Sequence, residues 1–302
     1  MIVCGTDLSS HAVAAATVAA QLAMRNGTSL ELICASGRRA PALGESEFPP
    51  QPIPVGELTA SSLQAEVDRL RALGVSVTGH LDPSVPDFAI ARRAEGDDVE
   101  LVVLGAVGRS RLERLILGSV SERVAMQSTK PVLVVRDEAP WRAWAADERP
   151  LRVLVAFDVG PSAAAALTWA SDFARAGNMQ LTVCWVVHPG LENRRFGAEG
   201  EGGGVELLPK TRAGLWYELQ RLAGVHGALP TMELHLEPNI GRVDAALVQL
   251  ARTQGHDLIV VGSNQRRGFD RLWKGSVSRG VLHDAPMSVV VVPARAPLDT
   301  AA

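Results

Sequence analysis

The strongest constraint on the fold is that the 302-residue chain carries the same pattern twice. Residues 2–36 and 152–186 both contain a short apolar run that ends in Asp, then an alanine-rich stretch with helical character, then a second apolar run. Residues 99–136 and 256–293 also match each other, with the same spacing of glycines. A repeat of this length predicts two similar domains.

The two copies differ slightly in length. Asp158 follows its counterpart Asp7 by 151 residues, whereas Gly262 follows its counterpart Gly105 by 157 residues. The second copy therefore has six more residues between these landmarks, and we expect them around the glycine-rich segment 197–204.

A charged segment flanked by prolines separates the copies, as is typical of linkers. It contains Trp141 and Trp144, which we expect to pack between the domains. The predicted organisation is a first domain at 1–137, a linker at 138–150 and a second domain at 151–296.

Within each copy, apolar strands alternate with helices. In the first copy we expect strands at 1–6, 29–35, 75–81, 100–104 and 131–136, and helices at 9–25, 57–73, 85–95 and 118–128. This alternation predicts an α/β fold with a parallel sheet and right-handed crossovers. The last strands, PVLVV and SVVVVP, are rich in β-branched residues, as expected where helices cover both faces. Ligands of such sheets bind at the carboxyl ends of the strands.

Composition excludes several classes of function. The net charge is −3, so the basic surface of a nucleic-acid-binding protein is not expected. No apolar run approaches the roughly 18 residues of a membrane-spanning helix. The three cysteines form no CxxC pair, which indicates buried reduced thiols and a cytoplasmic protein. The seven histidines lack the spacing of metal ligands, so no metal site made by protein alone is expected.

The stretch GAVGRSRLERLILGSVS at 105–121 has two interpretations. Gly105 and Gly108 lack side chains and allow close approach of a phosphate to backbone N–H groups, and the following helix N-terminus attracts anions. Alternatively, the stretch is a turn before a capped helix, with Ser119 as N-cap and Glu122 completing a capping box. Both interpretations stay open from these residues alone.

The combined pattern resembles the universal stress protein family. The resemblance rests on the spacing Gly-2x-Gly-9x-Gly-Ser after an apolar strand, on first strands that end in Asp (VCGTD, VLVAFD), and on the last strands (STKPVLVVR, DAPMSVVVVP). It covers nearly the whole chain. It implies two tandem flavodoxin/Rossmann-like domains, each a five-stranded parallel sheet with helices on both faces, that bind ATP with Mg²⁺ and regulate a stress response.

The resemblance also implies which residues bind the nucleotide. In the first copy these are Gly5, Thr6, Asp7, Ala35, Gly105, Gly108, Arg109, Gly118, Ser119, Val120 and Ser121. The second copy has Gln265 in place of the second glycine and Phe157 in place of Thr6, and we expect Phe157 to crowd the adenosine end. Its weaker candidates are Asp158, Val186, Gly262, Gly275, Ser276 and Ser278.

Two other functions stay open. A slow ATPase would need a base for the attacking water, and no residue beyond Asp7 suggests itself, so no catalytic residue is assigned. An interaction module that has lost nucleotide binding is the other alternative. The family resemblance further implies pairing of the two domains through their last strands, and it leaves a homodimer open.

Overall fold

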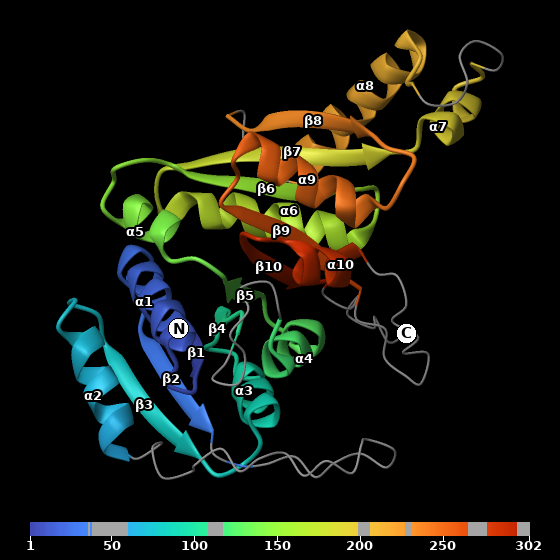
Figure 1. Cartoon of the computed structure of the whole chain (residues 1–302). Helices are drawn as coiled ribbons and strands as arrows, with labels where there is room; N and C mark the ends of the chain where they lie inside the picture. Colours follow the sequence, from blue (N-terminus) through green and yellow to red (C-terminus); the bar gives the residue numbers. More distant parts are fainter. Residues whose placement is uncertain are drawn as a thin grey trace, which may run out of the picture. The chain divides into compact units, whose positions relative to one another are not determined.

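The computed structural model places two compact units in the chain, Met1–Glu138 (unit 1) and Ala139–Ala302 (unit 2) (Figure 1). The residues that the structure describes are 1–35, 37, 60–107, 117–198, 206–226, 231–264 and 277–294. The boundary between the units falls one residue beyond the predicted end of the first domain at 137.

Unit 1 is built on a parallel sheet with strand order β3-β2-β1-β4-β5. Its elements are β1 (Ile2–Thr6), α1 (Ser10–Arg25), β2 (Leu30–Ala35), α2 (Ala60–Arg71), β3 (Val77–Asp82), α3 (Pro86–Ala94), β4 (Leu101–Gly105), α4 (Ser119–Gln127) and β5 (Val132–Val135). Every predicted strand and helix of the first copy is present, with boundaries within three residues of the expected ones. The α/β fold with a parallel sheet is therefore confirmed.

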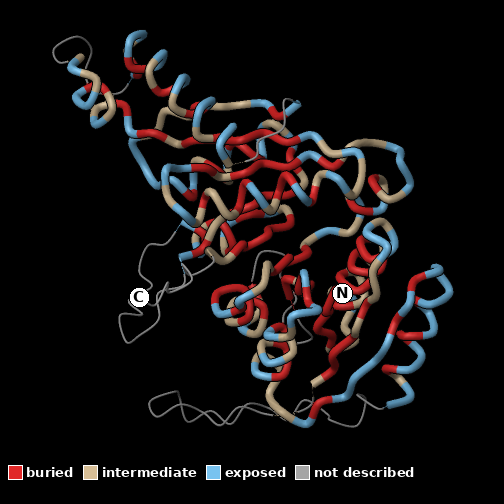
Figure 2. Tube along the Cα trace, turned by 180° about the vertical axis from the view of Figure 1, so that it is seen from behind, coloured by how far each residue is buried: buried red, intermediate tan, exposed pale blue. Residues whose placement is uncertain are grey.

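Helices cover both faces of the unit 1 sheet. α1 contacts β1, β4 and β5 and packs beside α2, while α3 and α4 pack against each other on β1, β2 and β5. Alanines on α1 are buried, and their small side chains bring this helix close to the sheet. The strands β1, β4 and β5 are buried almost throughout, as Figure 2 shows, because helices lie on both sides.

Unit 2 repeats this architecture, with strand order β10-β9-β6-β7-β8 and parallel pairing throughout. Its elements are α5 (Ala139–Ala145), β6 (Leu151–Phe157), α6 (Pro161–Phe173), a 3-10 turn (Ala174–Ala176), β7 (Met179–Val187), α7 (Pro189–Arg195), α8 (Pro209–Val225), β8 (Glu233–Pro238), α9 (Val243–Gln254), β9 (Leu258–Ser263), α10 (Val277–Asp284) and β10 (Ser288–Pro293). α6 packs on β6, β9 and β10, and the paired helices α9 and α10 contact β7, β9 and β10.

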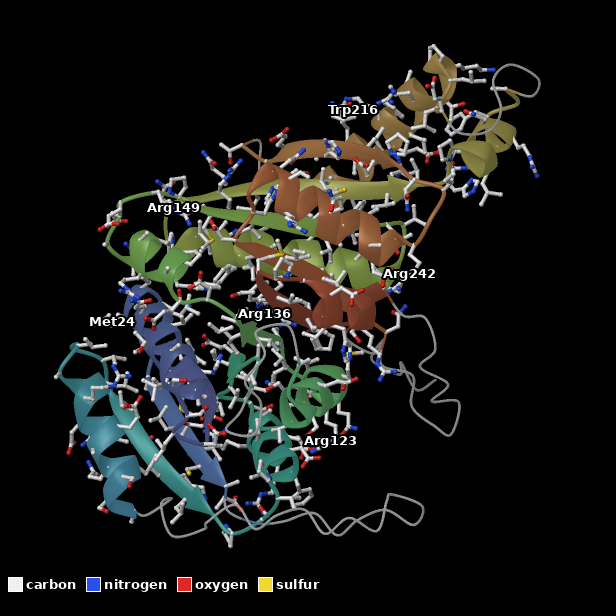
Figure 3. The ribbon with its side chains drawn as sticks, in the orientation of Figure 1. Met24, Arg123, Arg136, Arg149, Trp216 and Arg242 are labelled. Carbon is white, nitrogen blue, oxygen red and sulfur yellow. The ribbon has the colours of Figure 1, made fainter. Side chains whose placement is uncertain are left out.

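The segment 138–150 differs from the expected linker, because most of it forms α5 and belongs to unit 2. Trp141 and Trp144 are fully buried with their rings edge to face, and Trp141 donates a hydrogen bond from Nε1 to Oγ of Ser288 at 3.2 Å. Arg149, which is labelled in Figure 3, donates hydrogen bonds to both carboxylate oxygens of Asp257 at 2.7 and 2.9 Å. These contacts lie within unit 2, whereas we expected the tryptophans to pack between the domains.

The three cysteines are free and buried, as predicted. Burial raises the pKa of the Cys4 thiol far above its usual range and that of Cys184 to about 12, so both stay protonated at neutral pH. None of the helices in the described part of the chain combines the length and the apolar character needed to cross a membrane.

Candidate functional site

The carboxyl ends of the unit 1 strands form a row along one edge of the sheet. Ala35 at the end of β2 pairs with Asp82 at the end of β3, and Gly105 at the end of β4 pairs with Val135 at the end of β5. Thr6 ends β1, which lies between β2 and β4. From β1 the chain adds β2 and β3 on one side, and it then adds β4 and β5 on the other side, so the strand order reverses between β1 and β4. Open α/β sheets bind ligands at such a switch point.

The turn between β1 and α1 is stabilised by its own side chains. Thr6 accepts a hydrogen bond from the N–H of Leu8 at 3.0 Å, and Asp7 accepts one from the N–H of Ser9 at 3.0 Å. Ser9 caps the helix by accepting from the N–H of Ala12 at 3.3 Å. Leu8 has a φ of 59°, an uncommon value that these bonds hold in place. The N-terminus of α1 therefore already has a side-chain cap.

Two predicted glycines have a packing reason to be glycine. A Cβ on Gly105 would lie 2.9 Å from the carbonyl oxygen of His11 in the first turn of α1. A Cβ on Gly5 would lie 2.5 Å from Ile90 and 2.6 Å from Leu104. Close helix–strand packing thus accounts for both residues, and their contact with a ligand stays a prediction.

The N-terminus of α4 differs from that of α1, because its N-cap residue makes no side-chain hydrogen bond to the first turn. Gly118 is the N-cap, with φ −69° and ψ 140°, and its N–H donates to the carbonyl of Ala106 at 2.7 Å. Ser119 is therefore the first helical residue, and the expectation that it forms the N-cap of a capping box with Glu122 is wrong. The first N–H groups of any α-helix have no intrahelical acceptor, and in α4 these include the N–H of Val120. Gly118 has no side chain that could accept a hydrogen bond from them.

Ser121 uses its hydroxyl within the protein. The hydroxyl donates to the carbonyl oxygen of Gly105 at 2.7 Å, and the residue is only 7% exposed. The predicted contact of Ser121 with a phosphate is therefore more readily made by its backbone N–H. Gly108 and Arg109 lie outside the described residues, so their contribution stays a prediction.

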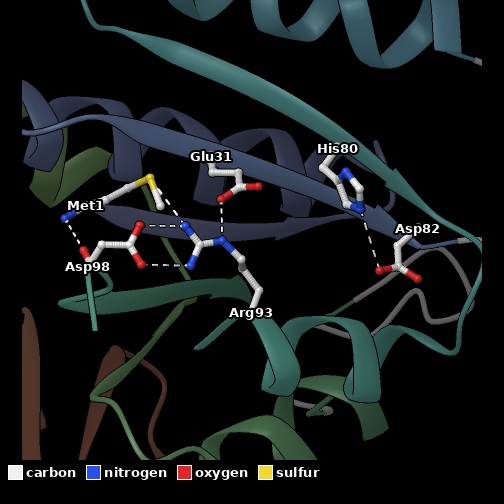
Figure 4. A network of polar contacts seen from close by, with 6 residues as sticks. All are labelled: Met1, Glu31, His80, Asp82, Arg93 and Asp98. Carbon is white, nitrogen blue, oxygen red and sulfur yellow. Dashed lines mark hydrogen bonds and ion pairs between the residues drawn. The ribbon is translucent and has the colours of Figure 1, made fainter. Parts of the chain in front are cut away.

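A carboxylate at the end of β3 was not singled out from the sequence. Asp82 is 3% exposed, accepts hydrogen bonds from the N–H and hydroxyl of Ser84, and accepts one from Arg92 at 2.6 Å. The bonds from Ser84, with the charges of Arg92 and His80, lower the pKa of Asp82 despite its burial (Figure 4). The Asp-x-Ser pattern of a self-capped turn was the available signal.

The counterpart edge of unit 2 keeps some of these features. Asp158 accepts from the N–H of Gly160 at 2.6 Å, as Asp7 does from Ser9, and Gly160 is an N-cap without a side chain. Phe157 is 5% exposed and packs against the ring of His226, with centroids 6.4 Å apart. The contact with His226 does not test whether Phe157 crowds a nucleotide, so that expectation stays a prediction.

The remaining unit 2 candidates are distributed as follows. Val186 lies half-buried in β7, and a Cβ on Gly262 would lie 2.1 Å from the carbonyl oxygen of Ser162, so this glycine repeats the packing of Gly105. Ser278 is buried in the first turn of α10. Gly275, Ser276 and Gln265 lie outside the described residues.

Comparison with known proteins gives consistent results. A universal stress protein of Mycobacterium tuberculosis (Rv2005c) is 31% identical over 202 residues, which is 65% of this chain and 62% of that protein. One from Mycolicibacterium smegmatis is 30% identical over 202 residues, covering 64% of this chain and 61% of that protein. The aligned segment thus spans less than two thirds of the length of these relatives.

Two solved structures share the fold over 97% of this chain. A universal stress protein from Archaeoglobus fulgidus has a TM-score of 0.68 at 19% identity, with 98% of its chain covered. A functionally unknown protein from Pseudomonas aeruginosa, PA1789, has a TM-score of 0.64 at 17% identity, with 92% covered. The sequence model of the universal stress protein family matches both copies of the repeat, at 1–136 and 151–293, and the chain therefore belongs to the universal stress protein family.

Proposed function

We propose that unit 1 binds ATP with Mg²⁺ at the carboxyl edge of its sheet, and that the chain acts as a nucleotide-dependent regulator of a stress response. One observation carries the proposal. Two helices begin at the switch point of the sheet, α1 after β1 and α4 after β4, and of these two only α4 has an N-cap residue without a capping side chain in the described part of the chain. An uncapped helix start is suited to a phosphate group, because its N–H groups point outward and its dipole is positive there.

The proposed pose follows from the two ends of this edge. The phosphates contact the N–H groups of Ser119, Val120 and Ser121, and the adenosine lies toward the ends of β1 and β2, at Thr6 and Ala35. Family membership and the row of strand ends both support this direction. Asp7, at the same edge, would accept hydrogen bonds from the ribose or hold Mg²⁺ through water, and the metal would neutralise phosphate charge.

We propose that unit 2 binds the nucleotide more weakly. The substitution of a motif glycine by Gln265 supports this, since a side chain there limits approach of a phosphate to the backbone. Asp158 and Gly262 are retained, so the overall edge is preserved while the phosphate end is altered.

The test uses Gly118, because its backbone angles are open to any residue. Gly118→Asp supplies an N-cap that competes for the N–H groups of α4 and places a negative charge against the phosphates. We expect calorimetry to show one strong ATP–Mg²⁺ site in the wild type, weakened by at least about tenfold in Gly118→Asp. The melting temperature of unit 1 should not fall, because the new cap stabilises α4 by about 1 kcal/mol.

Gly118→Asn is the matched control, since it offers the same cap without the charge. It should weaken ATP binding less than Gly118→Asp does. Unchanged affinity in both variants would place the phosphates elsewhere. No binding to the wild type, checked by thermal shift with ATP–Mg²⁺, would favour the interaction module instead.

A further inference from the structure

Two hydrogen bonds join the start of α4 to the end of β4, and we call them the α4 clasp. The hydroxyl of Ser121 donates to the carbonyl of Gly105 at 2.7 Å, and the N–H of Gly118 donates to the carbonyl of Ala106 at 2.7 Å. The distance is ordinary for a hydroxyl donor and short for an N–H donor, so both are well-formed hydrogen bonds. The clasp therefore holds the end of β4 and the start of α4 next to each other.

The strand end that receives the clasp is itself fixed. The backbone of Gly105 lies against the first turn of α1, where even a Cβ would come within 2.9 Å of the carbonyl of His11. The next residue, Ala106, donates its N–H to the carbonyl of Val135 in β5 at 2.9 Å. The packing against His11 and the hydrogen bond to Val135 both restrain the end of β4, so the clasp attaches α4 to a fixed part of the sheet.

We propose that Ser121 is a positioning residue for the nucleotide site of unit 1, holding the uncapped start of α4 at a fixed place relative to Asp7. This inference rests on the proposed function of unit 1. Through the clasp, the helix start is connected to Gly105, then to the first turn of α1, which directly follows Asp7 and its turn. Groups at opposite ends of the proposed ligand are thus linked by one continuous set of contacts.

The chemistry of the hydroxyl favours positioning over direct binding. A serine has one O–H proton, and Ser121 gives it to Gly105, which leaves it only acceptor capacity toward a phosphate that itself needs donors. The backbone N–H groups of the first turn remain the donors. Their benefit depends on being held in the correct place before the ligand arrives, because ordering them on binding would lower the affinity.

The experiment compares Ser121→Ala with Ser121→Thr, which retains the hydroxyl, and with Ser278→Ala, which removes the equivalent buried serine of unit 2. The first readout is amide hydrogen exchange of the protein without nucleotide. We expect Ser121→Ala to accelerate exchange of the N–H groups of Gly118 and Glu122, which donate hydrogen bonds at the start of α4, and the other two variants to leave it as in the wild type. This readout does not depend on whether ATP binds.

The second readout is calorimetric affinity for ATP–Mg²⁺ and for adenosine. Ser121→Ala should weaken ATP by about tenfold and leave adenosine unchanged, whereas a general loss of stability would affect both equally. Unchanged exchange overturns the inference. Unchanged exchange with weakened ATP binding identifies Ser121 as a direct ligand and also overturns it. If the wild type binds no ATP, the proposed function fails, and the exchange readout still decides whether the clasp holds α4.

Discussion

At the scale of single residues, the two units repeat one contact near the ends of β4 and β9. Gly105 in β4 lies against the carbonyl of His11, and Gly262 in β9 lies against the carbonyl of Ser162, in the first turn of α1 and of α6 respectively. Each glycine is followed by the connection to the next helix. The glycine that opens the motif is thus required by helix–strand packing, whether or not a ligand is bound.

Replacing Gly105 by Ala should therefore destabilise unit 1. The added Cβ would sit 2.9 Å from a backbone oxygen, which can move only with α1 itself, and overpacking of this kind costs about 1–3 kcal/mol. Urea unfolding followed by circular dichroism measures the change. The same substitution at Gly224 is the control, since a Cβ there meets no atom within 4 Å and the residue lies in α8.

Gly224→Ala should leave unit 2 unchanged or stabilise it by up to about 1 kcal/mol, because alanine favours helix. Opposite signs for the two glycines would support the packing explanation. Equal effects, or a Gly105→Ala protein as stable as the wild type, would show that α1 adjusts freely and would contradict it.

At the scale of elements, α3 of unit 1 and α9 of unit 2 carry a carboxylate at the same repeat position, but its cation comes from different places. In unit 1, Asp87 on α3 accepts a hydrogen bond at 2.6 Å from Arg123 on α4, and Arg123 is labelled in Figure 3. In unit 2, Asp244 is paired with Arg242 at the start of its own helix, and Gly280 on α10 stands where unit 1 has arginine. The arginine that pairs with the carboxylate thus comes from the neighbouring helix in unit 1 and from the start of the same helix in unit 2.

Arg242→Val, which copies Val85 of unit 1, should destabilise unit 2 by about 1–3 kcal/mol, because a mostly buried Asp244 loses its cation. Burial opposes ionisation of Asp244, yet the hydrogen bond and charge of Arg242 outweigh it and lower the pKa. The stability from this pair is therefore present above the unfolded pKa of about 3.9 and is lost as pH falls through the folded value. Urea titrations at pH 7 and pH 3.5 should show the deficit of the variant shrinking.

Adding Gly280→Arg to Arg242→Val should recover part of the stability, since it restores the unit 1 arrangement across the two helices. A Cβ on Gly280 would collide with Asp244 in its present position, so the carboxylate must turn away once Arg242 is gone. If the double variant is less stable than the single one, the two arrangements are not interchangeable and the interpretation of the pair is wrong.

The same scale shows what could be predicted from sequence. Strands and long helices followed from alternating apolar runs, because burial on both faces leaves a strong pattern. α5 was missed because it has only seven residues and lies within a charged segment that is typical of a linker. The burial of Trp141 and Trp144 in unit 2 shows that this segment is part of the folded unit. The Ser121–Gly105 bond was missed because it joins two elements sixteen residues apart and depends on how they pack.

At the scale of the whole molecule, the two units have diverged in the polar groups near the amino ends of their strands. In unit 1, Arg93 binds Glu31 at 2.7 Å and Asp98 at 2.8 Å (Figure 4). In unit 2, the counterparts of Glu31 and Arg93 are Thr182 and Leu250, so this ion-pair network is replaced. The pairing of the units through their last strands stays a prediction.

Unit 2 instead buries His256, where unit 1 has Val99. His256 is 7% exposed, its Nε2 lies 3.2 Å from the hydroxyl of Thr182, and its Nδ1 faces no hydrogen-bond partner among the described residues. Burial and the charge of Arg152 lower the pKa of His256, and the backbone of Ala251 together with the carboxylates of Asp257 and Glu233 opposes this only in part. The folded unit therefore holds this histidine neutral.

We expect unit 2 to lose stability on acidification before unit 1 does. Above the unfolded histidine pKa of about 6.5, both states are neutral at His256 and nothing is lost. Below it, the unfolded chain takes up a proton that the folded unit resists, so the free energy of unfolding falls by up to about 1.4 kcal/mol per pH unit until the folded pKa is reached. His256→Val, which copies Val99, should remove this dependence.

The sequence itself supplies the means to separate the units. All six tryptophans lie at or beyond position 141, so tryptophan fluorescence follows unit 2, while circular dichroism follows both units. Urea unfolding at pH 7.5 and pH 5.5 should shift the fluorescence transition of the wild type to lower urea, with a smaller shift in His256→Val. A wild-type transition at the same urea concentration at both pH values would mean that His256 has the same pKa in the folded and the unfolded chain, and the explanation from its burial beside Arg152 would be wrong.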